Sequence, residues 1–182
     1  MSKKAIISGV FGSSFGELKG SSCLALHAEA AWGAIADAGL SPADIDGVIC
    51  AYSVVEPHLM LASWFSEYAG LRPNVCFAIQ SGGATAATMV AQASALVENG
   101  ACRHVLTVTG DNRLTGLSRG GAVAALSQVG HPQFERPYGI SIPAAYALVA
   151  TRYMQEYDVK PEHLAAIAVS ARGERREKRR GP

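Results

Sequence analysis

The sequence has no apolar run near the roughly 20 residues that a membrane-spanning helix needs, and charged residues make up only 17% of its 182 positions. Hydrophobic residues make up 49%, a share that excludes a disordered chain. The apolar stretch after Lys3 and Lys4 is broken by Gly9 and Gly12, too early for a secretory signal. A chain of this length fits one domain, or one large half of a two-part fold. We therefore expect a soluble, globular protein of the cytoplasm.

Patterns that bind metals are also missing. The four cysteines, at positions 23, 50, 76 and 102, form no Cys-x-x-Cys pair, and the five histidines show no ligand spacing. A chain of this size does not need disulfides to hold its core. We expect reduced thiols and neither a structural metal nor a bound cofactor.

No basic patch with interleaved aromatic residues, as nucleic-acid binders carry, occurs in the body of the chain. Residues 1–171 hold 10 Lys and Arg against 13 Asp and Glu, whereas residues 172–182 hold 6 against 2. The excess positive charge is thus confined to one short tail, which we interpret as a solvated end. The sequence predicts no nucleic-acid partner.

What the sequence does contain is an alternation of apolar runs and helical stretches. Strands are expected near residues 4–10, 46–54, 74–79 and 104–110, because β-branched and apolar residues are almost continuous there. Helices are expected over about 21–38, 58–69 and 82–98, with Ser21 or Ser22 as the first N-cap and Gly39 just after its end. This spacing predicts an α/β fold with a largely parallel sheet.

The chain changes character after residue 111. Residues 112–139 contain five glycines and two prolines and predict a long loop, which in a compact domain is usually functional or covered by a partner. A helical segment follows over 140–172, with one helix near 142–157 and another opened by Pro161. We therefore divide the chain into an α/β core (1–111), a loop region (112–139), a helical segment (140–172) and a charged tail (173–182).

The stretch 82–98 carries no charge before Glu98 and consists mostly of small side chains. A helix that is apolar around its whole circumference is normally buried on all sides. A single sheet covers one side only, so we expect a second covering layer from outside this chain. A one-sided, alanine-rich helix is the simpler alternative.

The junction Gln80-Ser81-Gly82-Gly83 places a strand end against the N-terminus of that helix. Glycines permit a tight turn there, and backbone N–H groups with the helix dipole favour a phosphate or an oxyanion. Neither this junction nor the glycines at 9–16 fit a Walker A loop or a dinucleotide fingerprint, so a nucleotide-binding protein is only weakly indicated. Ordinary turns between a strand and a helix are the alternative interpretation of both glycine clusters.

The order of these segments resembles that of thiolase-like proteins, and within them the sterol-carrier/lipid-transfer-type thiolases (acetyl-CoA acetyltransferase-like). The resemblance covers about residues 4–172. It rests on Ala5-Ile-Ile-Ser-Gly-Val10, on residues 29–48, on Gln80-Ser-Gly-Gly-Ala84, on Val105-Leu-Thr-Val-Thr-Gly110, and on residues 134–139, 146–157 and 163–169. It implies a βαβαβαβ half-fold, layered αβα, that completes an αβαβα sandwich with a second half.

The resemblance also implies acyl-CoA chemistry, in which a cysteine thioester serves carbon–carbon condensation or cleavage. The position of that cysteine is Ile79 here, and isoleucine cannot attack a thioester. Cys76 lies three residues earlier, and this odd offset sends its side chain to the other face of the strand. Thiolase-like proteins without the cysteine resemble retro-aldolases, which cleave β-hydroxyacyl-CoA and use tyrosines of the second half.

The substrate-binding candidates are Gln80, Ser81, Gly82 and Gly83, together with His131 and Tyr138. Gly130-His131-Pro132 resembles a motif that thiolase-like proteins carry in the second half of their fold, although a plain loop histidine is the simpler interpretation. Tyr138 either lines an acyl pocket or serves packing. Asp111, at the end of the fourth expected strand, is either a functional residue or a cap of the turn that follows it, and the cap is the simpler interpretation.

We therefore expect a thiolase-like acyl-CoA protein for carbon–carbon cleavage or condensation, retro-aldol-like or inactive, with a coenzyme A thioester as substrate. Its partner would be a second copy or a second thiolase-like half, and the resemblance adds an OB-fold subunit. The alternative is a non-catalytic half-fold that acts as an interaction or scaffold subunit. The tail 173–182 resembles a truncation rather than the family's continuation.

Overall fold

A computed structural model describes residues 4–178, apart from the side chains of Arg119 and of residues 174–178. The chain divides into two compact units, residues 1–122 (unit 1) and 123–182 (unit 2). The last four residues of the charged tail expected at 173–182 lie outside the described residues.

Unit 1 is built on a parallel sheet of three strands: β1 (Gly47–Ala51), β2 (Val75–Ile79) and β3 (Val105–Val108). The strand order is β2-β1-β3, with Gly47 aligned to both Val75 and Val105. The central strand β1 is buried along its whole length, which explains its unbroken apolar sequence. The α/β class with a parallel sheet is confirmed.

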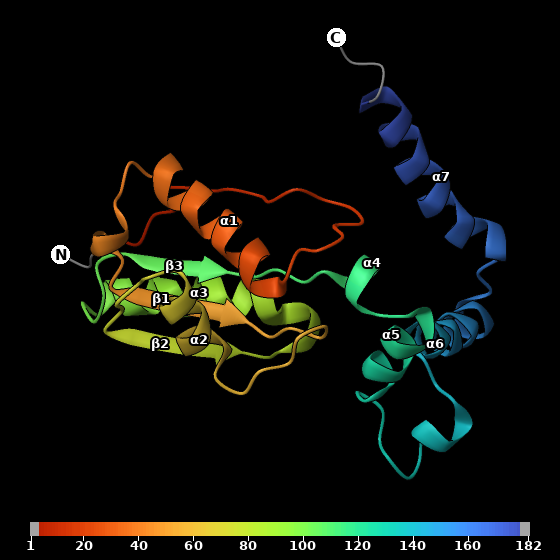
Figure 1. The fold of residues 1–182 in the computed structure, drawn as a ribbon. Coiled ribbons are helices and arrows are strands. Elements are labelled where there is room, and N and C mark those ends of the chain that lie inside the picture. Colours follow the sequence, from red (N-terminus) through yellow and green to blue (C-terminus); the bar gives the residue numbers. More distant parts are fainter. Residues whose placement is uncertain (1–3, 179–182) are drawn as a thin grey trace. The chain divides into compact units, whose positions relative to one another are not determined.

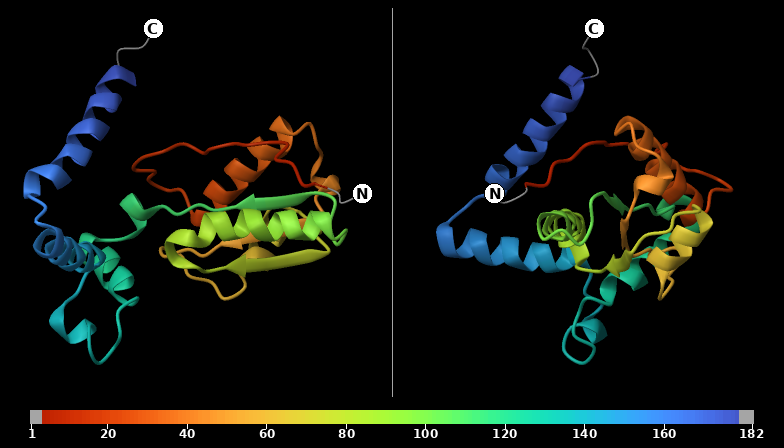
Figure 2. Two further views of the ribbon diagram at one scale, coloured as in Figure 1. Left: turned by 180° about the vertical axis from the view of Figure 1, so that it is seen from behind. Right: turned by 90° about the vertical axis from the view of Figure 1, so that its left-hand side faces the viewer.

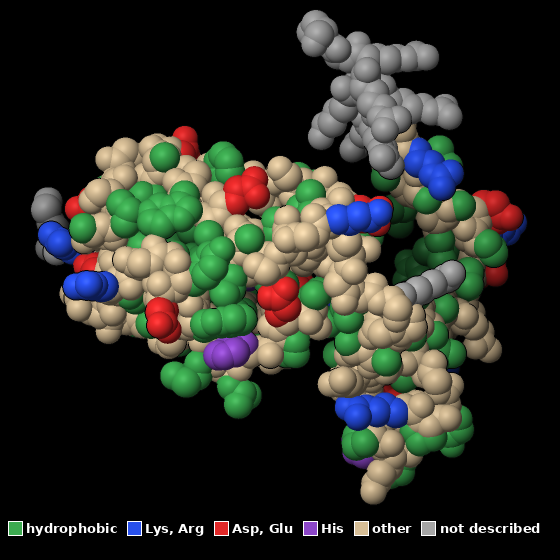
Figure 3. Space-filling model, viewed as in Figure 1, with side chains coloured by type: hydrophobic (Ala, Val, Ile, Leu, Met, Phe, Trp, Pro, Cys, Tyr) green, Lys and Arg blue, Asp and Glu red, His purple; other side chains and the backbone are tan. Residues whose placement is uncertain are grey.

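Helices cover the two faces of this sheet (Figures 1 and 2). On one face α1 (Cys23–Asp37) and α2 (Leu61–Tyr68) enclose the larger core, which includes Ile35, Val48 and Phe65. On the other face α3 (Thr85–Glu98), preceded by the 3-10 turn η2 (Gly82–Ala84), packs on Ile49 and Ala51 through Met89. Unit 1 is thus an αβα three-layer structure. Figure 3 shows that hydrophobic side chains also reach the surface on the α1–α2 side.

Local sequence explains the ends of α1. The Ser22 hydroxyl accepts a hydrogen bond from the Ala25 N–H at 3.1 Å, as an N-cap does. After the C-cap Ala38, Gly39 takes a left-handed φ of +66°, and Pro42 opens the short η1 (Pro42–Asp44). These caps are as the sequence predicts. Helix α2 begins three residues later than expected, at Leu61.

Helix α3 is covered on one side only within unit 1. Its buried residues are Thr85 and Met89, and Met89 packs against the sheet. On the rest of the helix Ala86, Ala87 and Ala91 are exposed, and Val90 is 48% exposed. The second layer expected around this helix is therefore not supplied by unit 1.

The strand expected at residues 4–10 is an error of the sequence interpretation. This segment is coil, and Ile6, Ile7 and Val10 are largely exposed. It runs along α1, where the Val10 N–H donates to Asp37 at 2.8 Å and Gly9 lies so close to Ala34 that a Cβ would clash. A strand needs a neighbouring strand for its backbone groups, and no described strand pairs with this segment.

The loop expected over residues 112–139 is also partly wrong, because it contains α4 (Arg113–Gly116), α5 (Arg119–Ser127) and η3 (Arg136–Tyr138). Ala122, Ala124, Ala125 and Leu126 are good helix formers, and the two glycines of α5 fall in its first turn, where they cost little. The Arg136 guanidinium donates to the Gly130 and Gln128 carbonyls and closes the intervening loop.

Unit 2 continues with α6 (Ile142–Tyr157) and α7 (Pro161–Lys178). The sequence predicts both helices, and the bounds of α6 agree with the expectation. Ser141 caps α6 through the Ala144 N–H at 3.3 Å. None of the helices in the described part of the chain is long and apolar enough to cross a membrane.

Candidate functional site

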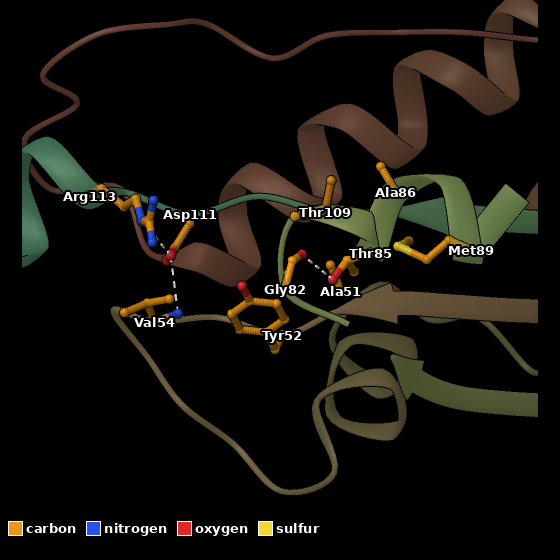
Figure 4. Close-up of a pocket in the computed structure, with 11 residues that line it drawn as sticks. Ala51, Tyr52, Val54, Gly82, Thr85, Ala86, Met89, Thr109, Asp111 and Arg113 are labelled. Carbon is orange, nitrogen blue, oxygen red and sulfur yellow. Dashed lines mark hydrogen bonds and ion pairs between the residues drawn. The ribbon is translucent and has the colours of Figure 1, made fainter. Parts of the chain in front are cut away.

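A pocket of about 290 Å³ lies in unit 1 where the carboxyl ends of β1 and β3 meet the N-terminus of α3. Parallel α/β sheets commonly bind ligands at this edge. We call it the α3 pocket (Figure 4). Its lining consists of Ala51, Tyr52, Val54, Gly82, Gly83, Thr85, Ala86, Met89, Thr109, Asp111 and Arg113.

The turn into α3 is fixed by its own hydrogen bonds. The Thr85 hydroxyl donates to the Gly82 carbonyl at 2.7 Å and accepts from the Ser81 N–H at 3.0 Å. Gly82 adopts a left-handed φ of +55°, which side chains with a Cβ rarely take. At Gly83 a Cβ would meet nothing within 4 Å, so the pocket is open above this residue. The chain thus exposes backbone at the positive end of a 14-residue helix.

The opposite side of the pocket is carried by the segments that leave β1 and β3. Tyr52 and Val54 follow β1, whereas Thr109 and Arg113 come from the segment after β3. Between them stands Asp111, whose carboxylate accepts from the Val54 N–H at 3.0 Å and pairs with Arg113 at 3.6 Å (Figure 4). Asp111 does not cap the following turn as expected: Asn112 is the N-cap residue of α4.

Ile79 and Cys76 lie on opposite faces of β2. Ile79 packs with the α3-side core, whereas Cys76 packs against the α1–α2 core, with its sulfur 3.5 Å from the Ser66 hydroxyl. The strand period of two residues requires this separation. None of the residues lining the α3 pocket is a cysteine.

The other thiols are buried in the structure. All four cysteines are free, and Cys23, Cys50 and Cys102 are buried. Burial raises the pKa of the Cys50 thiol to about 12 and raises the pKa of Cys23 and Cys102 as well. A raised pKa disfavours the thiolate, so these three are poor nucleophiles. Among the described residues no cluster of His, Cys, Asp and Glu could hold a metal ion.

The chain is similar in sequence and in structure to several known proteins. It is 31% identical over 179 residues, 94% of its length, to the 17-hydroxy-3-oxo-4-pregnene-20-carboxyl-CoA lyase of Mycobacterium tuberculosis. It is 32% identical over 160 residues to an acetyl-CoA acetyltransferase of Methanocaldococcus jannaschii. It also superposes on a chain of the solved Ltp2-ChsH2(DUF35) aldolase with a TM-score of 0.65 and 30% identity, over 86% of its length. The chain is thiolase-like.

This thiolase-like chain spans less than half of these relatives: 45% of the lyase, 40% of the acetyltransferase and 39% of the aldolase chain. A third relative, a steroid side-chain-cleaving aldolase of Thermomonospora curvata, is 30% identical over 177 residues, which are 43% of its length. No family model matches the chain.

The candidates predicted from the sequence fall in different places. Gly82 and Gly83 line the α3 pocket, whereas Gln80 and Ser81 precede it and are exposed. His131 and Tyr138 belong to unit 2, where both are exposed and His131 stacks on Phe134 with ring centroids 4.8 Å apart. Their assignment to a substrate site stays a prediction.

Sequence reasoning missed several lining residues, chiefly Tyr52, Thr85, Thr109 and Arg113. A usable signal exists, because residues that directly follow parallel strands meet at one edge of the sheet. Tyr52 comes one residue after β1, and Thr109 one residue after β3. The register that brings them together is visible only in the structure.

Proposed function

We propose that this thiolase-like chain holds the acyl end of a coenzyme A thioester in the α3 pocket, with Gln80 to Gly83 at its reactive end. The pocket combines an apolar floor at Ala51 and Met89 with hydroxyl groups from Tyr52 and Thr109. It opens at the N-terminus of α3, where the helix dipole stabilises an oxygen that gains negative charge. A thioester carbonyl gains such charge when a carbon–carbon bond beside it breaks or forms.

The reaction we propose is cleavage by a retro-aldol route, and the observation that carries this choice is Ile79. In a retro-aldol step a base takes the proton of the β-hydroxyl group, and the bond between the α and β carbons breaks. The electron pair passes to the thioester oxygen, and the α carbon then takes up a proton. This route needs no covalent thioester, which Ile79 could not form. The names of two relatives, a lyase of a carboxyl-CoA and a steroid side-chain-cleaving aldolase, support the same reaction class.

The test is an assay on a 3-hydroxyacyl-CoA with a tertiary hydroxyl group, run with the chain alone and with its purified partner subunit. We expect a ketone and a shortened acyl-CoA in equal amounts, with no acyl adduct on the protein by mass spectrometry. An acyl adduct on any of the four cysteines would contradict the proposed route.

The exposed side of α3 supports a proposal about assembly. An apolar helix face with Val90 and several alanines in water is normally covered. We propose that a second thiolase-like half, or a second copy of this chain, covers it and completes a five-layer sandwich. A further OB-fold subunit is proposed because the similar aldolase structure contains two named components. Static light scattering tests the second-copy form, for which a dimer is expected and a monomer is the contrary result.

A second candidate function is a non-catalytic subunit that only completes a partner's fold. Ile79 and the exposed face of α3 favour it together, since one removes the nucleophile and the other provides a surface for pairing. The two functions separate in one measurement, because a scaffold would assemble without binding an acyl-CoA in the α3 pocket.

A further inference from the structure

The Asp111 carboxylate collects more hydrogen bonds than any other side chain at the edge of the α3 pocket. It accepts from the Ser53 hydroxyl at 2.9 Å, the Val54 N–H at 3.0 Å and the Val55 N–H at 3.3 Å. The buried Cys23 thiol donates to it at 3.3 Å. The Arg113 guanidinium pairs with it at 3.6 Å.

These contacts join the two segments that leave the paired strands β1 and β3. Residues 53–55 leave β1, and Asp111 and Arg113 follow β3. Each segment contributes lining residues on its side: Tyr52 and Val54 from one, Thr109 and Arg113 from the other. Ser53 extends the link, because its hydroxyl also accepts from the Glu56 N–H at 2.8 Å.

We infer that Asp111 is a positioning residue of the α3 pocket: its carboxylate fixes the 53–55 backbone and the Arg113 guanidinium as one rim against which a coenzyme A thioester binds. The inference rests on the proposed function. Asp111 is not a catalytic residue in this account, because its oxygens are occupied by protein donors. It acts through Val54, Tyr52 and Arg113, which line the pocket.

A matched control exists at the other end of the same strands. Asp46 precedes β1 and accepts from the Arg103 and His104 N–H groups, each at 2.9 Å, and it pairs with Arg103 at 3.7 Å. The side chains of Asp46 and Asp111 are similarly buried, at 19% and 17% exposed. Asp46 is not among the residues that line the α3 pocket. A purely structural role would therefore give the two aspartates the same phenotype.

The experiment compares Asp111→Asn with Asp46→Asn in the full chain, measuring the thermal midpoint and the affinity for acetyl-CoA by titration calorimetry. The asparagine side chain has one accepting oxygen, whereas aspartate has two. Both variants therefore lose hydrogen bonds from backbone N–H groups and melt at a lower temperature. We expect Asp111→Asn alone to weaken acetyl-CoA binding, by about tenfold or more. We also expect Arg113→Gln to weaken acetyl-CoA binding and Arg103→Gln to leave it unchanged. Both arginine variants should lose less stability than the aspartate variants.

If Asp111→Asn does not fold, Ser53→Ala takes its place in the experiment. Ser66→Ala is its control, because both serines are buried to the same extent. Ser53→Ala is expected to weaken binding and Ser66→Ala to leave it unchanged. Equal affinities within each pair would overturn the positioning role while the proposed function stands. Absence of acetyl-CoA binding by the unmodified chain would overturn the proposed function, and this inference with it.

Discussion

Cys76 and Ile79 are three residues apart on β2 and face opposite sides of the sheet: the thiol packs towards α2, and the isoleucine packs towards α3. The side chain at position 79 is thus an inert hydrocarbon in the α3-side core, and the nearest thiol in sequence cannot replace it. The opposite orientation of these two side chains favours a reaction without a covalent thioester intermediate.

Replacing Ile79 by cysteine should create a reactive thiol. A cysteine at a helix N-terminus has a lowered pKa and is largely thiolate at neutral pH. We expect iodoacetamide to modify Ile79→Cys about tenfold faster than Phe77→Cys, which lies on the same strand face but two residues farther from the turn into α3. Peptide mass spectrometry after a short pulse measures both rates. Equal rates would mean that position 79 does not lie under the influence of the α3 N-terminus.

The two glycines of the α3 turn should respond differently to alanine. Gly82→Ala forces a Cβ into a left-handed conformation and is expected to cost about 1 kcal/mol of unfolding free energy. Gly83→Ala meets no neighbour and is expected to change stability by less than about 0.5 kcal/mol. Denaturant unfolding of the two variants checks the contrast, and a reversed order would show that the turn has a different conformation.

The buried His27 should make stability depend on pH. Its ring is fully buried, with Nδ1 2.7 Å from the Cys23 carbonyl oxygen and no partner for Nε2, and burial lowers its pKa below 6.5. The unfolded chain therefore takes up this proton at a higher pH than the folded one, so stability is complete above about pH 6.5 and falls on acidification. The slope is at most about 1.4 kcal/mol per pH unit.

Unfolding free energies between pH 5 and 7 measure this effect. His27→Gln should remove the slope, whereas the exposed His58→Gln should retain it. Asp46 does not contribute to this slope. Burial of its carboxyl acts to raise the pKa, but the hydrogen bonds from the His104 and Arg103 N–H groups outweigh it, and the pKa is lowered from its ordinary value of 3.8. The stability that Asp46 contributes is therefore lost only as the pH falls below about 3.8. A slope that survives His27→Gln would assign the effect to another group.

Much of the fold could be predicted, because its signals are local. The three paired strands are continuous apolar runs, and α1 is delimited by Ser22 and Gly39. The segment 4–10 looks the same as those runs in composition, but pairing depends on a neighbouring strand that composition cannot reveal. In α5 the two glycines suggested a loop, whereas the alanines that follow them determine the helix.

The site was predictable only in part for a related reason. Gly82 and Gly83 have a local signature, a glycine pair between a strand and a helix. Tyr52, Thr109 and Asp111 have none, because they come together only through the β2-β1-β3 order and its register. The sequence offers Asp111 as a functional residue or a turn cap but does not show its positioning role, since its partners at 53–55 are more than 50 residues away.

Binding of a coenzyme A thioester in the α3 pocket is tested by titrating acetyl-CoA into the chain and into two tryptophan variants. Thr109→Trp fills the pocket, whereas Ala101→Trp adds the same bulk at an exposed position before β3. We expect acetyl-CoA to bind to the unmodified chain and to Ala101→Trp, and its affinity to fall about tenfold or more in Thr109→Trp. Equal binding by all three proteins, or none by the unmodified chain, would contradict it.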